Sequence, residues 1–291
     1  MAGDTLRLTP VSSQISFGAM RANGFEAQPQ DLVMTFLGAY LVPHDRLVWS
    51  GGLVTLLGDF GFSTGASRVA LARMVRRGGL ERLRNGRLVS YRPTPRTVAL
   101  LEEGDRRIFA LGREPHSAEL WTALWHAIPE ERRLERGRLA RRLRFLGFGS
   151  VQDAMWISPH DREEEVVALI ESLGVGGHAG VLVGRPAAGL DFAALASRAW
   201  DLDALDSRYR AFIDEFSSVA ASAGADEHEA FRLRTRLVHV FRRFPALDPE
   251  LPDELMHAPR FRAEAVALFH RLYAALAPSA QRHFDAVTSA P

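Results

Sequence analysis

The sequence predicts an α+β protein of several domains: an N-terminal winged helix-turn-helix, a middle ferredoxin-like α/β sandwich and a mostly α-helical C-terminal domain. With 291 residues, the chain is longer than one compact core of ordinary size requires. Helical patterns followed by a basic hairpin come first, strands then alternate with helices, and the remainder is helical in pattern. We expect a flexible tail at 1–28 and domains at 29–112, 113–192 and 193–291.

The composition excludes several classes of protein. Apolar residues make up 47% and charged residues 24% of the chain, which is typical of a folded, soluble protein. The chain has no cysteine, so disulfides, thiolate catalysis and cysteine-ligated zinc are excluded. No apolar run reaches the roughly 18 residues of a membrane helix, and the first residues lack a basic-then-apolar signal segment. We therefore expect a cytoplasmic protein that does not contact a membrane.

The positive charge is concentrated in one region. The net charge is only +1, and all 36 basic residues are arginine. Residues 63–92, however, contain eight arginines and a single acid, Glu81. A basic module joined to mildly acidic ones predicts a polyanionic partner for that module alone.

The N-terminal domain is expected to contain three helices and a hairpin. An apolar helix over 30–42 is followed by a second over about 50–60 and a third over about 63–77, which Gly78-Gly79 ends. Two strand-like runs on either side of Asn85-Gly86 then predict a β-hairpin. Three helices followed by a hairpin make a winged helix-turn-helix.

The other two domains have different patterns. In the middle domain a strand (SAELWTALWHAI) precedes an arginine-rich helix over 130–146, one or two strands (GFGSVQDAMWIS), a helix over 161–173 and a last strand (HAGVLVGR). This alternation is typical of a ferredoxin-like sandwich. Prolines are expected to break the helices of the C-terminal domain at Pro245, Pro249, Pro252, Pro259 and Pro278.

The segment Gly61-Phe-Ser-Thr-Gly65 has two incompatible interpretations. It fits the G-x-S-x-G pattern of a serine esterase or thioesterase with Ser63 as nucleophile. Such an elbow needs a buried strand before the serine, whereas Leu53, Leu56 and Leu57 show helical spacing. We favour the second interpretation, the turn before a recognition helix, and expect no catalytic residues and no enzymatic activity.

The third helix would have one packed side and one side suited to DNA. At about 100° per residue, the inner side comprises Ser67, Leu71, Met74, Val75 and Gly78. Small residues near the start of the outer side allow close approach to a major groove, and arginines can reach phosphates or guanine edges. The residues expected at the DNA are Ser63, Ala66, Arg68, Val69, Arg73, Arg76 and Arg77 on the helix, with Arg84, Asn85 and Arg87 at the hairpin tip.

Two clusters of acids with a histidine resemble metal-binding patterns. One is His160-Asp161 with the acids at 163–165, and the other is Asp226-Glu-His-Glu229. Acidic residues are also favoured at the start of a helix, where they meet its positive end. We interpret both clusters as helix starts and expect no metal site and no bound cofactor.

Three stretches of the chain, in order, resemble PaaX-type transcriptional regulators. They are GGLVTLLGDFGFSTGASRVALARMVRRGGLERLRNGRLVSY at 51–91, WTALWHAIPEERRLERGRLARRLRFLGFGSVQDAMWISP at 121–159, and a third motif in two pieces, WDLDALDSRYRAF and RLRTRLVHVFRRFPALDPELP. The resemblance covers roughly residues 30–290. Gly79 and Phe261 stand where the family usually has tryptophan.

The resemblance implies a homodimeric repressor that binds an operator in double-stranded DNA. In the best-known members this repression controls phenylacetic acid catabolism and is relieved by an aryl-acyl coenzyme A thioester, typically phenylacetyl-CoA. The family's DNA-contacting motif falls on Arg68, Arg73, Arg84 and Arg87. The middle domain also resembles a small CRISPR-associated nuclease, which leaves a nucleic-acid enzyme as a third hypothesis. Residues 124–127 (LWHA), however, lack the carboxylate with which that nuclease binds metal.

Four side chains are candidates for holding such an effector. Arg236, His239 and Arg243 are spaced three and four apart and would share a helix face. With Tyr209, they could surround the phosphates or thioester of a coenzyme A ligand. The competing interpretation, which we favour, is a salt-bridge network among these residues and nearby acids.

Overall fold

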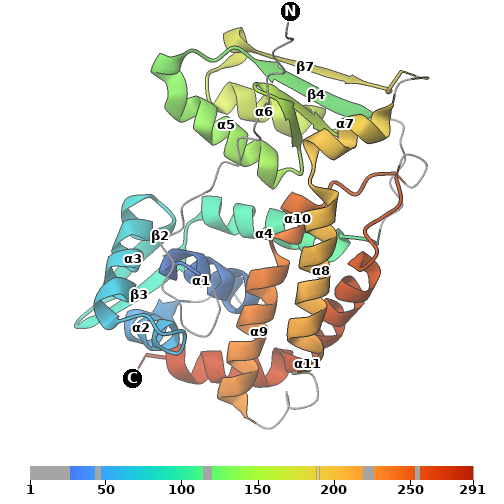
Figure 1. The fold of residues 1–291 in the computed structure, drawn as a ribbon. Helices are drawn as coiled ribbons and strands as arrows, with labels where there is room; N and C mark the ends of the chain where they lie inside the picture. The colour runs from blue at the N-terminus through green and yellow to red at the C-terminus, as the bar shows by residue number, and fades with distance from the viewer. Residues whose placement is uncertain are drawn as a thin grey trace, which may run out of the picture.

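The computed structural model describes residues 27–42, 47–113, 120–187, 189, 191–218, 226–252 and 256–290. It contains helices and two small antiparallel sheets, which confirms the predicted α+β class. The four-stranded sheet and its helices lie at one end of the molecule, and the remaining helices and the three-stranded sheet form the rest (Figure 1). The tail predicted at 1–28 lies outside the described residues, except for its last two.

The first part of the chain contains the predicted helices and hairpin. The hairpin is joined by a short strand that the sequence did not indicate, giving a sheet of order β1-β3-β2. The elements are α1 (Pro29–Phe36), η1 (Leu37–Leu41), β1 (Val48–Trp49), α2 (Ser50–Gly58), α3 (Thr64–Arg76), β2 (Leu80–Asn85), β3 (Leu88–Pro93) and α4 (Pro95–Ala110).

The first helix differs from the prediction in its last turn, which is a π-helix over Leu37–Leu41. Side chains from the end of the chain bind two carbonyl groups of this turn. Arg234 donates to the carbonyl oxygen of Ala39 at 3.1 Å, and Gln281 donates to that of Tyr40 at 3.3 Å. The turn is therefore held by tertiary contacts, which a local sequence pattern does not reveal.

The middle part has β-α-β-β-α-β connectivity, with all strand pairs antiparallel and the order β5-β6-β4-β7. Its elements are β4 (Trp121–His126), η3 (Glu130–Arg132), α5 (Arg133–Phe145), β5 (Gly149–Gln152), β6 (Met155–Ser158), α6 (Glu163–Ser172), η4 (Gly176–His178) and β7 (Ala179–Gly184). Leu139 and Val166 of α5 and α6 pack with Leu124 on one face of the sheet. The other face packs against α7 (Phe192–Ala199), where Trp121 meets Trp200.

The last part consists of helices α8 (Leu202–Ser217), α9 (Glu227–Phe241), α10 (Phe244–Leu247) and α11 (Arg262–Thr288). The prediction that Pro278 breaks a helix is wrong, because α11 runs through it. Pro278 faces solvent, where water can bind the carbonyl that the missing N–H leaves free, while Leu276 and Ala280 are buried beside it. Among the described helices, none has the combination of length and apolar character that crossing a membrane requires.

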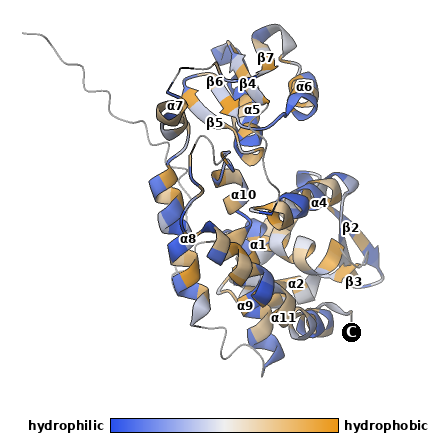
Figure 2. Cartoon of the chain, turned by 90° about the vertical axis from the view of Figure 1, so that its right-hand side faces the viewer, coloured by the Kyte–Doolittle hydropathy of each residue, from blue (hydrophilic) through white to orange (hydrophobic). Residues whose placement is uncertain are grey.

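The first and last parts of the chain share one hydrophobic core. Both views place α1 beside α9 and away from the four-stranded sheet (Figure 1, Figure 2). The Tyr40 ring stacks on Phe284 at 5.0 Å, and its hydroxyl lies 3.1 Å from the Thr235 hydroxyl. Helix α2 approaches α11 so closely that a Cβ at Gly52 would lie 2.4 Å from the Val287 carbonyl oxygen. The predicted domains 29–112 and 193–291 thus pack as a single block, and their boundaries stay a prediction.

Candidate nucleic-acid interface and ligand cavity

Helix α3 begins directly after Ser63, the N-cap residue of the helix. The Ser63 hydroxyl oxygen accepts a hydrogen bond from the N–H of Ala66 at 3.2 Å, which satisfies one of the free donors at the helix start. Gly61, with φ of +86°, makes the turn from α2 into this cap. The segment before Ser63 is therefore a helix and a turn. The esterase alternative loses its support, because a nucleophile elbow requires a strand there.

The inner face of α3 packs against α1 and α2. Ser67, Leu71 and Met74 are buried as predicted, and Ala70 is buried with them. The prediction that Gly78 lies on the inner side is wrong. Gly78 is exposed, with φ of +69°, because it forms the turn that ends the helix. The packing direction of α3 therefore follows from its apolar spacing.

The outer face of α3 is exposed along its whole length. All the residues of the helix that were predicted to contact DNA are exposed, namely Ser63, Ala66, Arg68, Val69, Arg73, Arg76 and Arg77. A Cβ at Gly65 would meet nothing within 4 Å, so packing within the chain does not require a glycine at this position. Val69 is an exposed apolar side chain beside the arginines, with 50% of its surface accessible.

The hairpin turns at Gly86 and Arg87. Asn85 and Leu88 are the last paired residues, so Asn85 ends β2 rather than sitting in the loop. Gly86 has φ of +59°, which suits the first loop position of a tight hairpin. Arg84 donates from Nε to the Gly86 carbonyl oxygen at 2.9 Å, which holds its side chain across the turn. Arg84, Asn85 and Arg87 are all exposed at the tip.

Two threonines hold the hairpin against the end of α3. The Thr94 hydroxyl donates to the Gly78 carbonyl oxygen at 2.8 Å, and the Thr97 hydroxyl donates to that of Gly79 at 2.9 Å. These bonds connect the start of α4 to the turn between helix and hairpin. The helix and the hairpin are therefore held in a defined relative position.

Most arginines on α3 and the hairpin are not paired with a carboxylate. The single acid of the region, Glu81, pairs with Arg92 at 2.6 Å across the hairpin. Within the described parts of the chain, no ion pair is formed by Arg68, Arg73, Arg76, Arg77, Arg82 or Arg87. The surface formed by α3 and the hairpin, called the basic surface below, thus presents free guanidinium groups to solvent.

The four candidate effector residues have different surroundings. Tyr209 and His239 are buried in the core, where Tyr209 donates to Asp248 at 2.7 Å and the His239 ring lies 3.1 Å from the Thr35 hydroxyl. Arg236 pairs with Glu215 at 2.5 Å. The prediction that Arg243 shares a helix face with Arg236 and His239 is wrong, because α9 ends at Phe241 and Arg243 lies exposed in the following turn.

Both acidic clusters start helices, as predicted. Asp161 accepts a hydrogen bond from the N–H of Glu163 at 3.0 Å at the start of α6. Asp226 accepts one from the N–H of His228 at 3.1 Å at the start of α9. In the second cluster the His228 ring also turns towards Asp59, with 3.4 Å between Nε2 and Oδ1.

A cavity of about 630 Å³ lies where the middle part meets the other two. Its walls come from α4, α5, α6 and the segment around α10 and contain four arginines, Arg106, Arg107, Arg142 and Arg162. This volume is in the range of sites for small organic ligands. The sequence did not reveal it, because its walls come from all three predicted domains.

Two of the four arginines are available to an anion. Arg142 pairs with Glu103, and Arg162 pairs with Glu165 at 3.0 Å. Among the described residues, Arg106 and Arg107 form no ion pair, although the carboxylates of Glu103 and Glu250 interact electrostatically with Arg107. Arg107 donates to the Pro245 carbonyl oxygen at 2.5 Å. Burial, together with the nearby positive charges of Arg162 and Arg142, lowers the pKa of Arg107 to about 10, so it remains charged at neutral pH.

Comparison with known proteins gives consistent results over most of the chain. Three family models match, described as PaaX-like protein at 28–96, PaaX protein central Cas2-like domain at 114–196 and PaaX-like protein C-terminal domain at 200–286. Transcriptional repressor PaaX from Escherichia coli (strain K12) is 27% identical over 269 residues, which cover 89% of this chain and 83% of that protein. Uncharacterized protein Rv0674 from Mycobacterium tuberculosis has a solved structure that matches with a TM-score of 0.51 at 25% identity, covering 89% of this chain and 99% of that one. The chain belongs to the PaaX family of transcriptional regulators.

Proposed function

We propose that this protein is a sequence-specific DNA-binding repressor. The observation that carries the proposal is the basic surface, on which free arginines and small residues share the outer face of α3 while the inner face is packed. In this proposal α1, α2, α3 and the hairpin form a winged helix-turn-helix. Helix α3 enters a major groove, and the hairpin tip meets the adjacent backbone or minor groove.

The chemistry of the basic surface suits both parts of DNA recognition. The guanidinium groups neutralise phosphates and release counterions, so binding depends strongly on salt. Arg68 and Arg73 are exposed on α3, from which an arginine can reach a phosphate or pair with guanine at a base edge, and Val69 offers an apolar contact for a thymine methyl group. Gly65 and Ala66 are small enough for the start of the helix to approach the DNA closely.

We further propose that the protein acts as a homodimer whose contact includes the four-stranded sheet. Strand β7 is an edge strand, and Leu182 on it has 64% of its surface exposed. Trp125 on neighbouring β4 is 44% exposed and lies on the same face of the sheet, because Leu182 pairs with Ala123 and strand residues alternate between faces. An open edge beside exposed apolar side chains favours association with a second copy.

The cavity is our candidate for the effector site. Arg106 and Arg107 would bind the phosphates of an aryl-acyl coenzyme A thioester such as phenylacetyl-CoA. Ala168 and Leu169 of the same wall would contact its apolar acyl part. The regulated genes would then belong to aromatic-acid catabolism of the phenylacetate type. This places the effector away from Tyr209, Arg236, His239 and Arg243.

An effector in this cavity would act on the angle between two units. The cavity is walled by α5 and α6 on one side and by α4 and the α10 segment on the other. A ligand that binds more tightly to one relative placement of these two sides increases the population of that placement. The size of the shift is limited by the difference between its affinities for the two placements. Release of the operator follows if the favoured placement misaligns the two recognition helices of a dimer.

Two linked measurements test this function. Selection from a random pool of DNA duplexes should yield a consensus bound at least about a thousandfold more tightly than random duplex at the same salt concentration. The selected duplex, bound by the protein, is then titrated with a panel of acyl-CoA thioesters and with free coenzyme A. Failure to enrich any sequence would overturn the repressor proposal. Enrichment without release by any thioester would overturn only the effector.

A further inference from the structure

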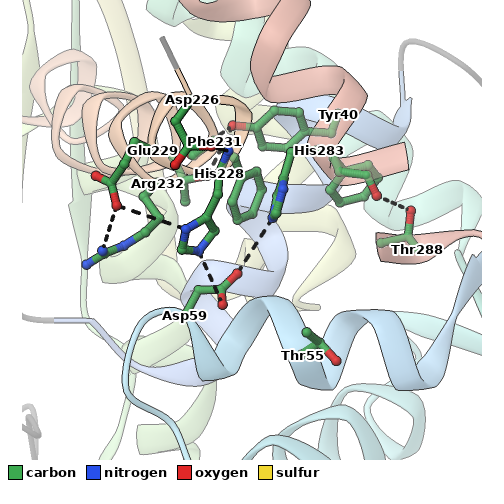
Figure 3. Close-up of polar contacts among 12 residues, drawn as sticks. Tyr40, Thr55, Asp59, Asp226, His228, Glu229, Phe231, Arg232, His283 and Thr288 are labelled. Carbon is green, nitrogen blue, oxygen red and sulfur yellow. Dashed lines mark hydrogen bonds and ion pairs between the residues drawn. The ribbon is translucent and has the colours of Figure 1, made fainter. Parts of the chain in front are cut away.

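Three side chains from distant parts of the chain converge beside α2 (Figure 3). Asp59 follows α2, His228 lies in the first turn of α9, and His283 lies near the end of α11. The Nε2 atom of His228 lies 3.4 Å from Oδ1 of Asp59, and Nε2 of His283 lies 3.9 Å from Oδ2 of the same carboxylate. One donor atom from each residue falls within 4.8 Å of the other two.

We propose that Asp59, His228 and His283 bind one divalent transition-metal ion of the zinc class. Two imidazoles and one carboxylate are a ligand set that zinc and its neighbours in the first row accept. Bond lengths of about 2.1 Å in a tetrahedral site place ligand atoms about 3.4 Å apart. The separation of His228 Nε2 from Oδ1 of Asp59 already has this value, and the separation of His283 Nε2 from Oδ2 exceeds it by about half an ångström. Since one donor atom from each residue lies within 4.8 Å of the others, binding would draw the three ligands closer together.

The Nε2 atom of His283, whose side chain is half-buried, provides a second observation. This atom is shielded from solvent and has no hydrogen-bond partner in the described part of the chain, because 3.9 Å is too long for a hydrogen bond to Asp59. The Phe231 ring lies 5.2 Å away and limits how the imidazole can turn. An ion between this nitrogen and the carboxylate would satisfy both groups.

The surroundings of His228 also suit a metal ligand. The Glu229 carboxylate lies 4.0 Å from Nδ1, on the other side of the ring from Asp59, and Arg232 holds this carboxylate at 3.1 Å. At 4.0 Å the Glu229 carboxylate does not hydrogen-bond the ring, but its negative charge beside the imidazole favours a bound cation. The His228 side chain is 39% exposed, so solvent can reach the site and a water molecule can complete the coordination.

A bound ion would connect three helices that are distant in the sequence. It would join the end of α2, which precedes the recognition helix, to α9 and α11 of the shared core. The site does not depend on the proposed DNA binding, because its ligands lie outside the basic surface. Its presence can therefore be tested by metal binding alone.

The test uses untagged protein that has been freed of metal with a chelator. Titration with Zn²⁺ should show one ion bound per chain, and Co²⁺ should give the visible absorption of a four- or five-coordinate site. His228→Gln and His283→Gln should each weaken Zn²⁺ binding by at least about tenfold and remove the Co²⁺ spectrum. The matched control is His257→Gln, an exposed histidine outside the cluster, which should bind as the unchanged protein does.

Either of two results would overturn the proposal. One is no saturable Zn²⁺ binding to the unchanged protein, and the other is equal binding by the His228→Gln/His283→Gln double variant. Circular dichroism checks the fold of each variant. If His283→Gln does not fold, the more exposed His228→Gln carries the comparison. Zn²⁺ should also raise the melting temperature of the unchanged protein and leave that of the variants unaltered.

Discussion

Arg73 offers the sharpest test of the basic surface. It is exposed on the outer face of α3 and forms no ion pair with any described residue, so its replacement should change the free energy of unfolding by no more than about 0.5 kcal/mol. If each of the seven arginines not paired with Glu81 meets a phosphate, the slope of log affinity against log salt is about −6 per protomer. Arg73→Ala should then reduce the slope by about 1 per protomer, and Arg73→Glu should abolish operator binding.

The assay is a fluorescence-anisotropy titration of a labelled operator duplex between about 50 and 200 mM salt. Arg208→Ala is the matched control, since Arg208 is an exposed arginine on α8, on the other side of the molecule from α3 (Figure 1). It removes the same charge and should leave both affinity and slope unchanged. If Arg73→Glu binds as tightly as the unchanged protein at physiological salt, α3 is not the recognition helix. A loss confined to one base position, with the slope preserved, would instead identify a contact to a base edge.

Three further predictions concern the cavity, the dimer and the core. Arg107→Ala should weaken the response to an acyl-CoA effector by at least about tenfold and leave operator affinity in its absence unchanged; calorimetry and anisotropy measure the two. Leu182→Asp should give a monomer in sedimentation analysis at concentrations where the unchanged protein is a dimer, and an unaltered sedimentation coefficient would contradict a β7 contact. Burial, with repulsion from Arg242 and Arg243, lowers the pKa of His239 to about 2, so between pH 7 and pH 5 only the unfolded state takes up its proton. His239 should therefore remove about 2 kcal/mol of stability over that interval, a loss that denaturant titrations should not find in His239→Gln.

Local patterns in the sequence were sufficient for the elements that form the basic surface. The spacing of Leu71 and Met74 gave the packed side of α3, and Ser63 caps the helix because its hydroxyl needs only its own helix start. The hairpin followed from a turn that Gly86 permits. Each of these features depends on residues within a few positions of one another, which is why the pattern and the structure agree.

Features that depend on distant contacts were not predictable in this way. The π-helical turn at Leu37–Leu41 depends on Arg234, and the continuity of α11 through Pro278 depends on buried neighbours. The candidate effector residues were grouped by helical spacing, but Tyr209 and His239 are used by the core. The residues of the proposed metal site and those of the cavity come from elements that are distant in the sequence, so no motif of fixed spacing groups them.

The core shared by the first and last parts of the chain restricts how new operator preferences can arise. A fragment that ends at residue 112 would lack Phe231 and Phe284, the aromatic partners of Phe36 and Tyr40. The part that carries the basic surface therefore cannot be exchanged as a separate unit. The outer face of α3, by contrast, is exposed in the described part of the chain. Divergence of target sequence within this lineage should therefore proceed through point substitutions on that face rather than through recombination of whole N-terminal segments.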